Sequence, residues 1–107
     1  MSNDFEIIWS DFAEKQLDEI YEYYKNRASI RVAKTLLMGI INAPNLLIDT
    51  PYIGQEEESL EHRKINYRYF IHNNYKLIYY VDEKNNFIKI ADVFDTRQNP
   101  IKIDRNK

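Results

Sequence analysis

Apolar and polar positions follow regular spacings along most of the chain. Between residues 5 and 9 apolar residues alternate with polar or mixed ones, which predicts a short strand with one buried face. Over residues 11–26 apolar side chains recur at helical spacing opposite a stripe of acidic residues, as in an amphipathic helix. Ser10 directly precedes this stretch and is a residue type that caps a helix N-terminus. The first third of the chain is therefore expected to be a strand followed by a helix.

A second helical stretch begins after Ser29, another capping residue, and its apolar stripe continues to Ile48. Because Pro44 cannot donate a hydrogen bond to the carbonyl of Ile40, we expect this helix to kink there. The short connection at residues 27–29 leaves room only for an antiparallel hairpin of the two helices. Residues 50–59 are then a loop, in which Gly54 is free to take a positive φ and the acidic run 56–58 is expected to be solvated.

The last third of the chain alternates most regularly. Apolar positions alternate over residues 65–71 and 75–81 and again from residue 88 toward Phe94, which predicts three strands. The segments 72–74 and 82–86 are rich in turn residues, so the strands are expected to be antiparallel and joined by hairpins. The predicted fold is α+β: a helical hairpin packed on one face of a small antiparallel sheet, in the order β-α-α-β-β-β, within a single domain at residues 1–107.

The same alternation assigns side chains to the two faces of the predicted sheet. Four tyrosines are expected on the face that packs on the helices: Tyr67, Tyr69, Tyr75 and Tyr79. Cationic and polar side chains are expected on the opposite face: Lys64, Asn66, Arg68 and Lys76. This arrangement predicts a polar sheet face on which cations converge.

Composition narrows the class of protein. The chain has 107 residues, 44% apolar and 30% charged, which is typical of one globular domain. It contains no cysteine, which excludes disulfides and thiolate zinc sites. There is no apolar run of the roughly 18 to 20 residues that span a bilayer and no signal-peptide pattern, so we expect a cytoplasmic protein that does not insert into membranes. No phosphate loop, metal cluster or nucleophile triad is visible, so no cofactor and no metal is expected.

The charges are segregated along the sequence. Residues 1–59 carry 5 Lys or Arg and 11 Asp or Glu (−6), whereas residues 60–107 carry 10 and 6 (+4). The basic half could face an anionic partner, and a solvated acidic helix beside a basic sheet would give the same pattern.

Several short motifs occur in a fixed order between about residues 5 and 101. They are Trp9-Ser10 before an amphipathic helix, Pro51-Tyr52-Ile53-Gly54 after the second helix, Arg63 at the start of a strand, Tyr75-Lys76-Leu77-Ile78-Tyr79-Tyr80-Val81, and the closing Val93-Phe94-Asp95-Thr96-Arg97-Gln98-Asn99-Pro100. This ordered set resembles the RelE/ParE toxins of type II toxin-antitoxin systems. The resemblance implies a toxin that a cognate antitoxin holds inactive.

The resemblance also implies two candidate activities, cleavage of mRNA on the ribosome and poisoning of DNA gyrase. A metal-independent ribonuclease needs a group that activates the 2′-hydroxyl, cations for the transition state and an acid for the leaving oxygen. The resemblance places Arg63, Lys76 and Arg97 where the RelE branch carries basic residues, which makes them the candidate catalytic or target-binding residues. Each could instead be an ordinary surface cation, and Arg97 could serve only a local salt bridge with Asp95.

One departure separates this chain from the RelE branch, which often carries a Tyr or His after the position of Arg97. Residues 101–107 contain neither, and His62 and His72 are interpreted as loop and turn residues. The sequence therefore favours a ParE-like toxin that is gyrase-directed or otherwise non-nucleolytic. A ribosome-dependent mRNA endonuclease and a degenerate, non-toxic binding module remain alternatives, so whether the chain is an enzyme stays open.

The expected partners are an antitoxin and a target, which is either DNA gyrase or the ribosome with mRNA. An antitoxin segment is expected to bury apolar area on the toxin. It is also expected to place acidic groups near Arg63, Lys76 or Arg97, because neutralising those cations would block an anionic target.

Overall fold

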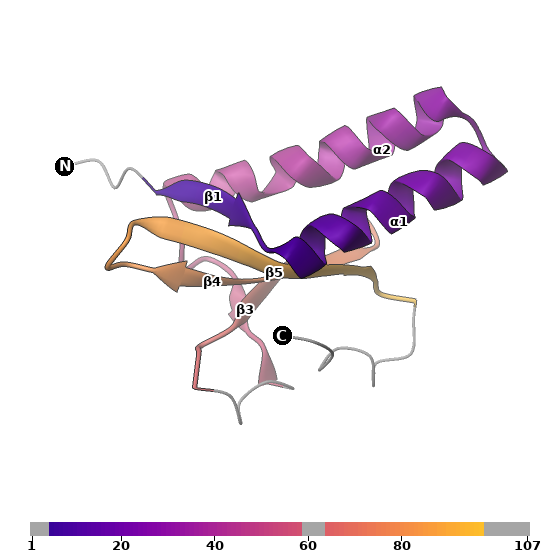
Figure 1. The fold of residues 1–107 in the computed structure, drawn as a ribbon. Helices are drawn as coiled ribbons and strands as arrows, with labels where there is room; N and C mark the ends of the chain where they lie inside the picture. The colour runs from indigo at the N-terminus through magenta and orange to yellow at the C-terminus, as the bar shows by residue number, and fades with distance from the viewer. Residues whose placement is uncertain (1–4, 59–63, 98–107) are drawn as a thin grey trace.

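The structure, a computed structural model, describes residues 5–58 and 64–97, and within them a helical hairpin lies on one face of a five-stranded sheet (Figure 1). The elements in chain order are β1 (Glu6–Trp9), α1 (Asp11–Arg27), α2 (Ile30–Asn42), the 3₁₀ helix η1 (Ala43–Ile48), β2 (Gln55–Glu56), β3 (Arg68–His72), β4 (Tyr75–Asp82) and β5 (Phe87–Asp95). The order across the sheet is β1-β5-β4-β3-β2. The predicted fold is confirmed, and the sheet is mixed because β1 pairs parallel to β5 while the other pairs are antiparallel.

Both helices begin where the sequence predicts. The hydroxyl of Ser10 accepts a hydrogen bond from the backbone N–H of Ala13 at 3.0 Å, and Ser29 caps α2 through Val32 at 3.1 Å. The predicted kink at Pro44 is instead a change of helix type, because α2 ends at Asn42 and the chain continues as η1. The proline stands in the first turn of η1, where its missing N–H costs no intrahelical bond.

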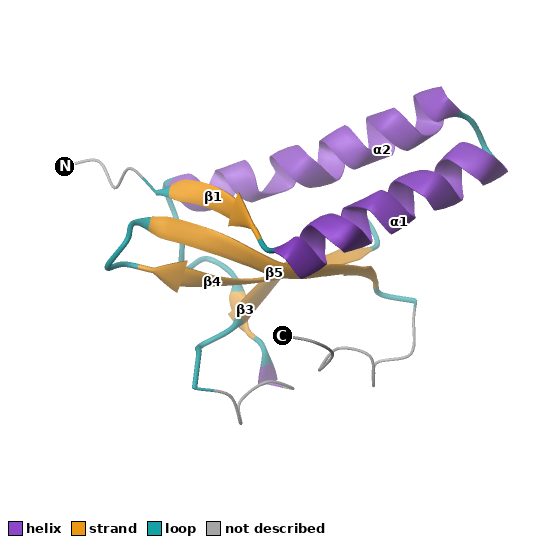
Figure 2. Cartoon of the chain, in the orientation of Figure 1, coloured by secondary structure: helices purple, strands orange, loops and turns teal. Residues whose placement is uncertain are grey.

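The main core lies between the helices and the sheet, the two layers that Figure 2 separates by colour. Leu17 of α1 and Ile40 of α2 are buried there against Leu77 and Tyr79 of β4 and Val93 of β5. The prediction that Tyr75 and Tyr79 lie on the face that packs on the helices is confirmed. Among the described residues, no helix is long and apolar enough to cross a membrane.

A second, smaller core covers the sheet face that points away from the helices. It contains Tyr67, Ile78, Ala91 and Phe94, with Tyr69 and Tyr80 packed against them. The prediction that Tyr67 and Tyr69 lie on the helix side is therefore wrong. Strand β3 has apolar side chains on both of its faces, so alternation alone does not show which face is turned toward the helices. Its pairing with β4 shows this, because directly paired residues share a face. Phe70 pairs with Leu77 and points to the helices, whereas Tyr69 pairs with Ile78 and points away.

The loop before β2 is fixed to the sheet by Tyr79 and Arg68. The Tyr79 hydroxyl accepts a hydrogen bond from the N–H of Gly54 at 3.0 Å and donates one to the carbonyl of Pro51 at 2.8 Å. A Cβ on residue 54 would lie 2.5 Å from that hydroxyl, so the glycine is required by close approach and not by a positive φ. Arg68 donates to the carbonyls of Tyr52 at 3.2 Å and Gly54 at 2.7 Å. Because Arg68 pairs with Tyr79, it lies on the helix side of the sheet, so the prediction that it shares a face with Lys76 is wrong.

Candidate functional site

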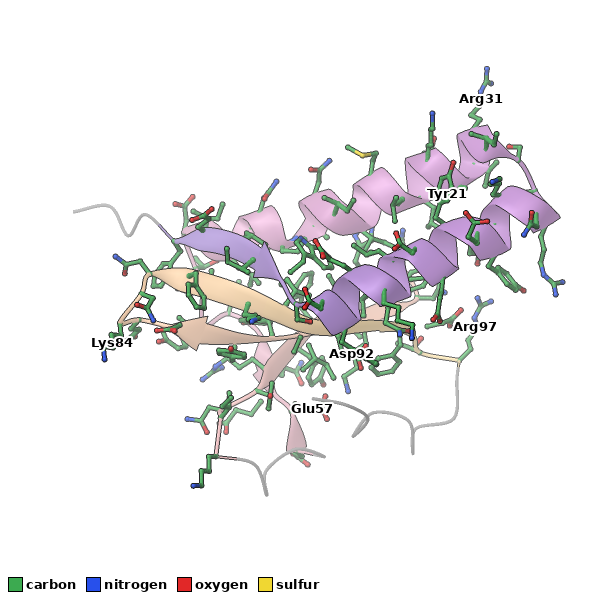
Figure 3. All side chains as sticks on the ribbon, in the orientation of Figure 1. Tyr21, Arg31, Glu57, Lys84, Asp92 and Arg97 are labelled. Carbon is green, nitrogen blue, oxygen red and sulfur yellow. The ribbon has the colours of Figure 1, made fainter. Side chains whose placement is uncertain are left out.

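Arg97 follows the end of β5 (Figure 3). The side chain of Asp95 holds it in place. The Arg97 Nε donates to the two carboxylate oxygens of Asp95 at 2.9 and 3.1 Å, and Nη2 donates to the same group. The backbone N–H of Arg97 also donates to Asp95 at 2.9 Å. The side chain of Arg97 nevertheless remains 70% exposed. One edge of the guanidinium is thus fixed by the protein while the side chain stays open to solvent.

Two tyrosines connect this arginine to α1 and β4. Burial raises the pKa of Tyr75, and its hydrogen bond with Tyr24 raises it further. Asp95 raises the pKa of Arg97, and the Tyr24 side chain adds to this effect. Tyr24 therefore interacts with both Tyr75 and Arg97, and it ties the second half of α1 to the end of the sheet. The sequence pattern placed Tyr75 on the face that packs on the helices, where it lies, but it did not predict the contact with Tyr24.

A hollow of about 340 Å³ opens beside Arg97, between α1 and the ends of β4 and β5. Its lining includes Ile20, Tyr23, Tyr24, Tyr75, Val93 and Arg97. Glu19 and Asp95 also border the hollow, so its charge is mixed and not simply basic. An exposed guanidinium beside aromatic and aliphatic side chains suits docking on a protein surface, since its planar donors bind carboxylates in pairs.

Lys76 lies on the face of the sheet that points away from the helices, beside the second core. Its Nζ lies 2.6 Å from the carboxylate of Glu57 and 4.1 Å from the ring centre of Tyr69. The Lys76 and Glu57 side chains are only 16% and 5% exposed. The predictions that Glu57 is solvated and that Lys76 stands on a polar face are both wrong. Directly after β2 the chain continues alongside the segment before β3, where the N–H of Glu57 donates to the carbonyl of Tyr67 at 2.9 Å.

Of the predicted cations, the described residues include Lys76 and Arg97, and the structure does not bring these two together. Arg97 and Lys76 are separated by the sheet, and each is already paired with an acid of the same chain. Arg63 and His62 lie outside the described residues. His72 lies at the end of β3 beside Gly39 of α2, away from Arg97. No three His, Asp or Glu side chains converge as a metal site within residues 5–58 and 64–97.

Because Asp95 and Arg97 form an ion pair, part of the free energy of unfolding should depend on pH. Hydrogen bonds from Arg97 lower the pKa of Asp95 to about 2, below the value of about 3.9 expected in the unfolded chain. The contribution is therefore complete above the unfolded pKa and is lost as the pH falls through the folded one. Asp95→Asn should lower the melting temperature at neutral pH, and the difference from wild type should shrink toward about pH 2. Thermal unfolding of Asp95→Asn and wild type, from neutral pH down to about pH 2, measures this difference in melting temperature.

The matched control is Asp18→Asn, which removes an exposed carboxylate from α1. A difference between Asp95→Asn and wild type that stays constant down to about pH 2 would show that the Asp95 pair does not titrate as described.

Comparison with known proteins adds to this geometry. A family model described as "ParE toxin of type II toxin-antitoxin system, parDE" matches residues 7–100. A solved structure titled "Chromosomal ParDE TA system from P. aeruginosa" is similar to this chain with a TM-score of 0.69 and 18% identity, covering 90% of this chain and 100% of that one. At this identity the likeness concerns the fold. No curated protein matches the sequence.

Proposed function

The chain belongs to the ParE toxin family of type II toxin-antitoxin systems, and from this membership we propose that it arrests growth by acting on DNA gyrase and is neutralised by a cognate antitoxin. The observation that carries the proposal is the family match over residues 7–100, which covers most of the chain. The resemblance in the sequence is thereby confirmed at the level of the family. Gyrase as the target and the cytoplasm as the place of action are parts of the proposal.

The placement of the cations supports a protein target over RNA cleavage. A ribonuclease site would need several cations directed at one phosphate, together with a general base and a general acid. Arg97 and Lys76 lie on opposite sides of the sheet, and Lys76 is occupied by Glu57. Arg97 remains as an exposed, oriented guanidinium beside the hollow of α1. A single arginine surrounded by aromatic side chains is typical of a contact between proteins.

Expression of the chain without its antitoxin tests the target. We expect growth arrest with induction of the DNA-damage response, stable mRNA, and inhibition of supercoiling when the purified chain is added to purified gyrase. Cleavage of mRNA at ribosome-bound codons without DNA damage would support the endonuclease instead. Normal growth at a confirmed level of folded protein would support a non-toxic binding module.

A further inference from the structure

The backbone that carries Arg97 is anchored to the sheet. The N–H and the hydroxyl of Thr96 both donate to the carbonyl of Asn74, at 2.8 and 3.0 Å. Asp95, the last residue of β5, pairs directly with Tyr75 of β4, so the two side chains share the face of the sheet that packs on the helices. Asp95 therefore holds Arg97 on the side of α1, at the hollow that both residues line.

Asp95 restrains only one edge of the guanidinium. It accepts hydrogen bonds from Nε and Nη2 of Arg97, which lie on the same edge of the planar group. An exposed ion pair between residues so close in sequence restrains a long side chain only weakly, because water competes for both groups. A second contact, from another element of the fold, is therefore required if the open edge of the guanidinium is to point in one direction.

Tyr24 of α1 supplies this second contact. It lines the same hollow as Tyr75, Asp95 and Arg97. Asp95 raises the pKa of Arg97 most, and a hydrogen bond with the Tyr24 side chain raises it further. Tyr24 also forms a hydrogen bond with Tyr75, which is buried in the main core. Tyr24 therefore joins the exposed guanidinium to a rigid part of the sheet.

The ring of Tyr24 is itself held by its neighbours on α1. It packs edge-on against the ring of Tyr23, with 5.0 Å between the ring centres and 76° between the planes. The guanidinium of Arg27 lies over the ring of Tyr23, 4.5 Å from its centre. A tyrosine side chain rotates about only two bonds, so a packed ring fixes the position of its hydroxyl. The hydroxyl of Tyr24 is thus a fixed point against which Arg97 can be oriented.

We propose that Tyr24 is a positioning residue for Arg97, and that its hydroxyl holds the guanidinium at the hollow in the orientation in which the target binds it. The inference rests on the proposed function, because it takes Arg97 as the residue that contacts the target. A side chain that is oriented before binding loses less conformational freedom when the complex forms. The Tyr24 hydroxyl should therefore strengthen target binding through Arg97, without contacting the target itself.

Tyr24→Phe tests the inference, because it removes the hydroxyl and keeps the ring. Tyr21→Phe is the matched control, since Tyr21 also belongs to α1 but does not line the hollow (Figure 3). Magnetic resonance relaxation of the Arg97 Nε–H group measures how firmly the side chain is held. Its order parameter should fall in Tyr24→Phe and keep the wild-type value in Tyr21→Phe. The concentration that half-inhibits supercoiling by purified gyrase should rise about three- to tenfold for Tyr24→Phe and stay within about twofold for Tyr21→Phe.

The two measurements separate this inference from the proposed function. An unchanged Arg97 order parameter in Tyr24→Phe would overturn the inference even if inhibition weakens, because the hydroxyl would then act by another route. A lowered order parameter with unchanged inhibition would also overturn it, because the orientation of Arg97 would not matter to the target. If the wild-type chain leaves gyrase active, the proposed target is wrong, whereas a lowered order parameter would still show that Tyr24 positions Arg97.

Discussion

Arg97→Ala should abolish growth arrest while the protein folds almost as stably as before. The side chain is 70% exposed, and its interactions with Asp95 and Tyr24 lie at the rim of the sheet rather than in either core. Surface substitutions of this kind change stability little. If the guanidinium contacts the target, its removal should return colony formation on induction to that of an empty vector. Urea unfolding of the purified variant should show a midpoint lowered no more than that of Asp95→Asn, which loses the same ion pair.

Two further variants make this result specific. Arg97→Lys should restore toxicity only in part, because lysine keeps the charge without the planar pair of donors. Arg31→Ala removes an exposed arginine from α2, outside the hollow beside Arg97, and should leave growth arrest intact when no antitoxin is present. Full toxicity of Arg97→Ala would show that the surface that contacts the target lies elsewhere on the protein. A large fall in the urea midpoint would show that Arg97 is structural.

The elements of the fold could be predicted where local signals agree. Ser10 and Ser29 cap the two helices as expected, and Asn73 and Asn86 adopt φ values of 55° and 58° in the hairpin turns. Caps and turns depend on a few neighbouring residues, so they can be read from short stretches of sequence. The sequence could not show which side chains of β3 face the helices, because Phe70 stands between two other apolar residues. Only the pairing of β3 with β4 determines that Phe70 is the one that faces them.

The same distinction between local and distant contacts applies to the candidate site. Asp95 and Arg97 are two residues apart, and the sequence already allowed a salt bridge between them. The pair of Glu57 and Lys76 joins distant parts of the chain and depends on the pairing of β2 with β3 and of β3 with β4. A glutamate within a run of three acids is normally solvated, so no nearby residue signals its burial.

Ile78→Ala should destabilise the protein about as much as Leu77→Ala, although the two side chains point to opposite faces of β4. Both are completely buried, Leu77 under the helices and Ile78 in the second core with Tyr67 and Phe94. Removal of a buried aliphatic side chain costs about 2 to 5 kcal/mol of unfolding free energy, because the cavity is only partly refilled. Urea denaturation of both variants measures the two values.

Ile71→Ala is the matched control, since Ile71 lies on the same face as Ile78, on the neighbouring strand, and is 50% exposed. Its replacement should change the unfolding free energy by about 0.5 kcal/mol or less. If the second core contributes to stability as its burial indicates, Ile78→Ala will resemble Leu77→Ala and differ clearly from Ile71→Ala. A value for Ile78→Ala close to that of Ile71→Ala would mean that the aromatic side chains over Ile78 do not form a packed core, and that the helix side alone stabilises the sheet.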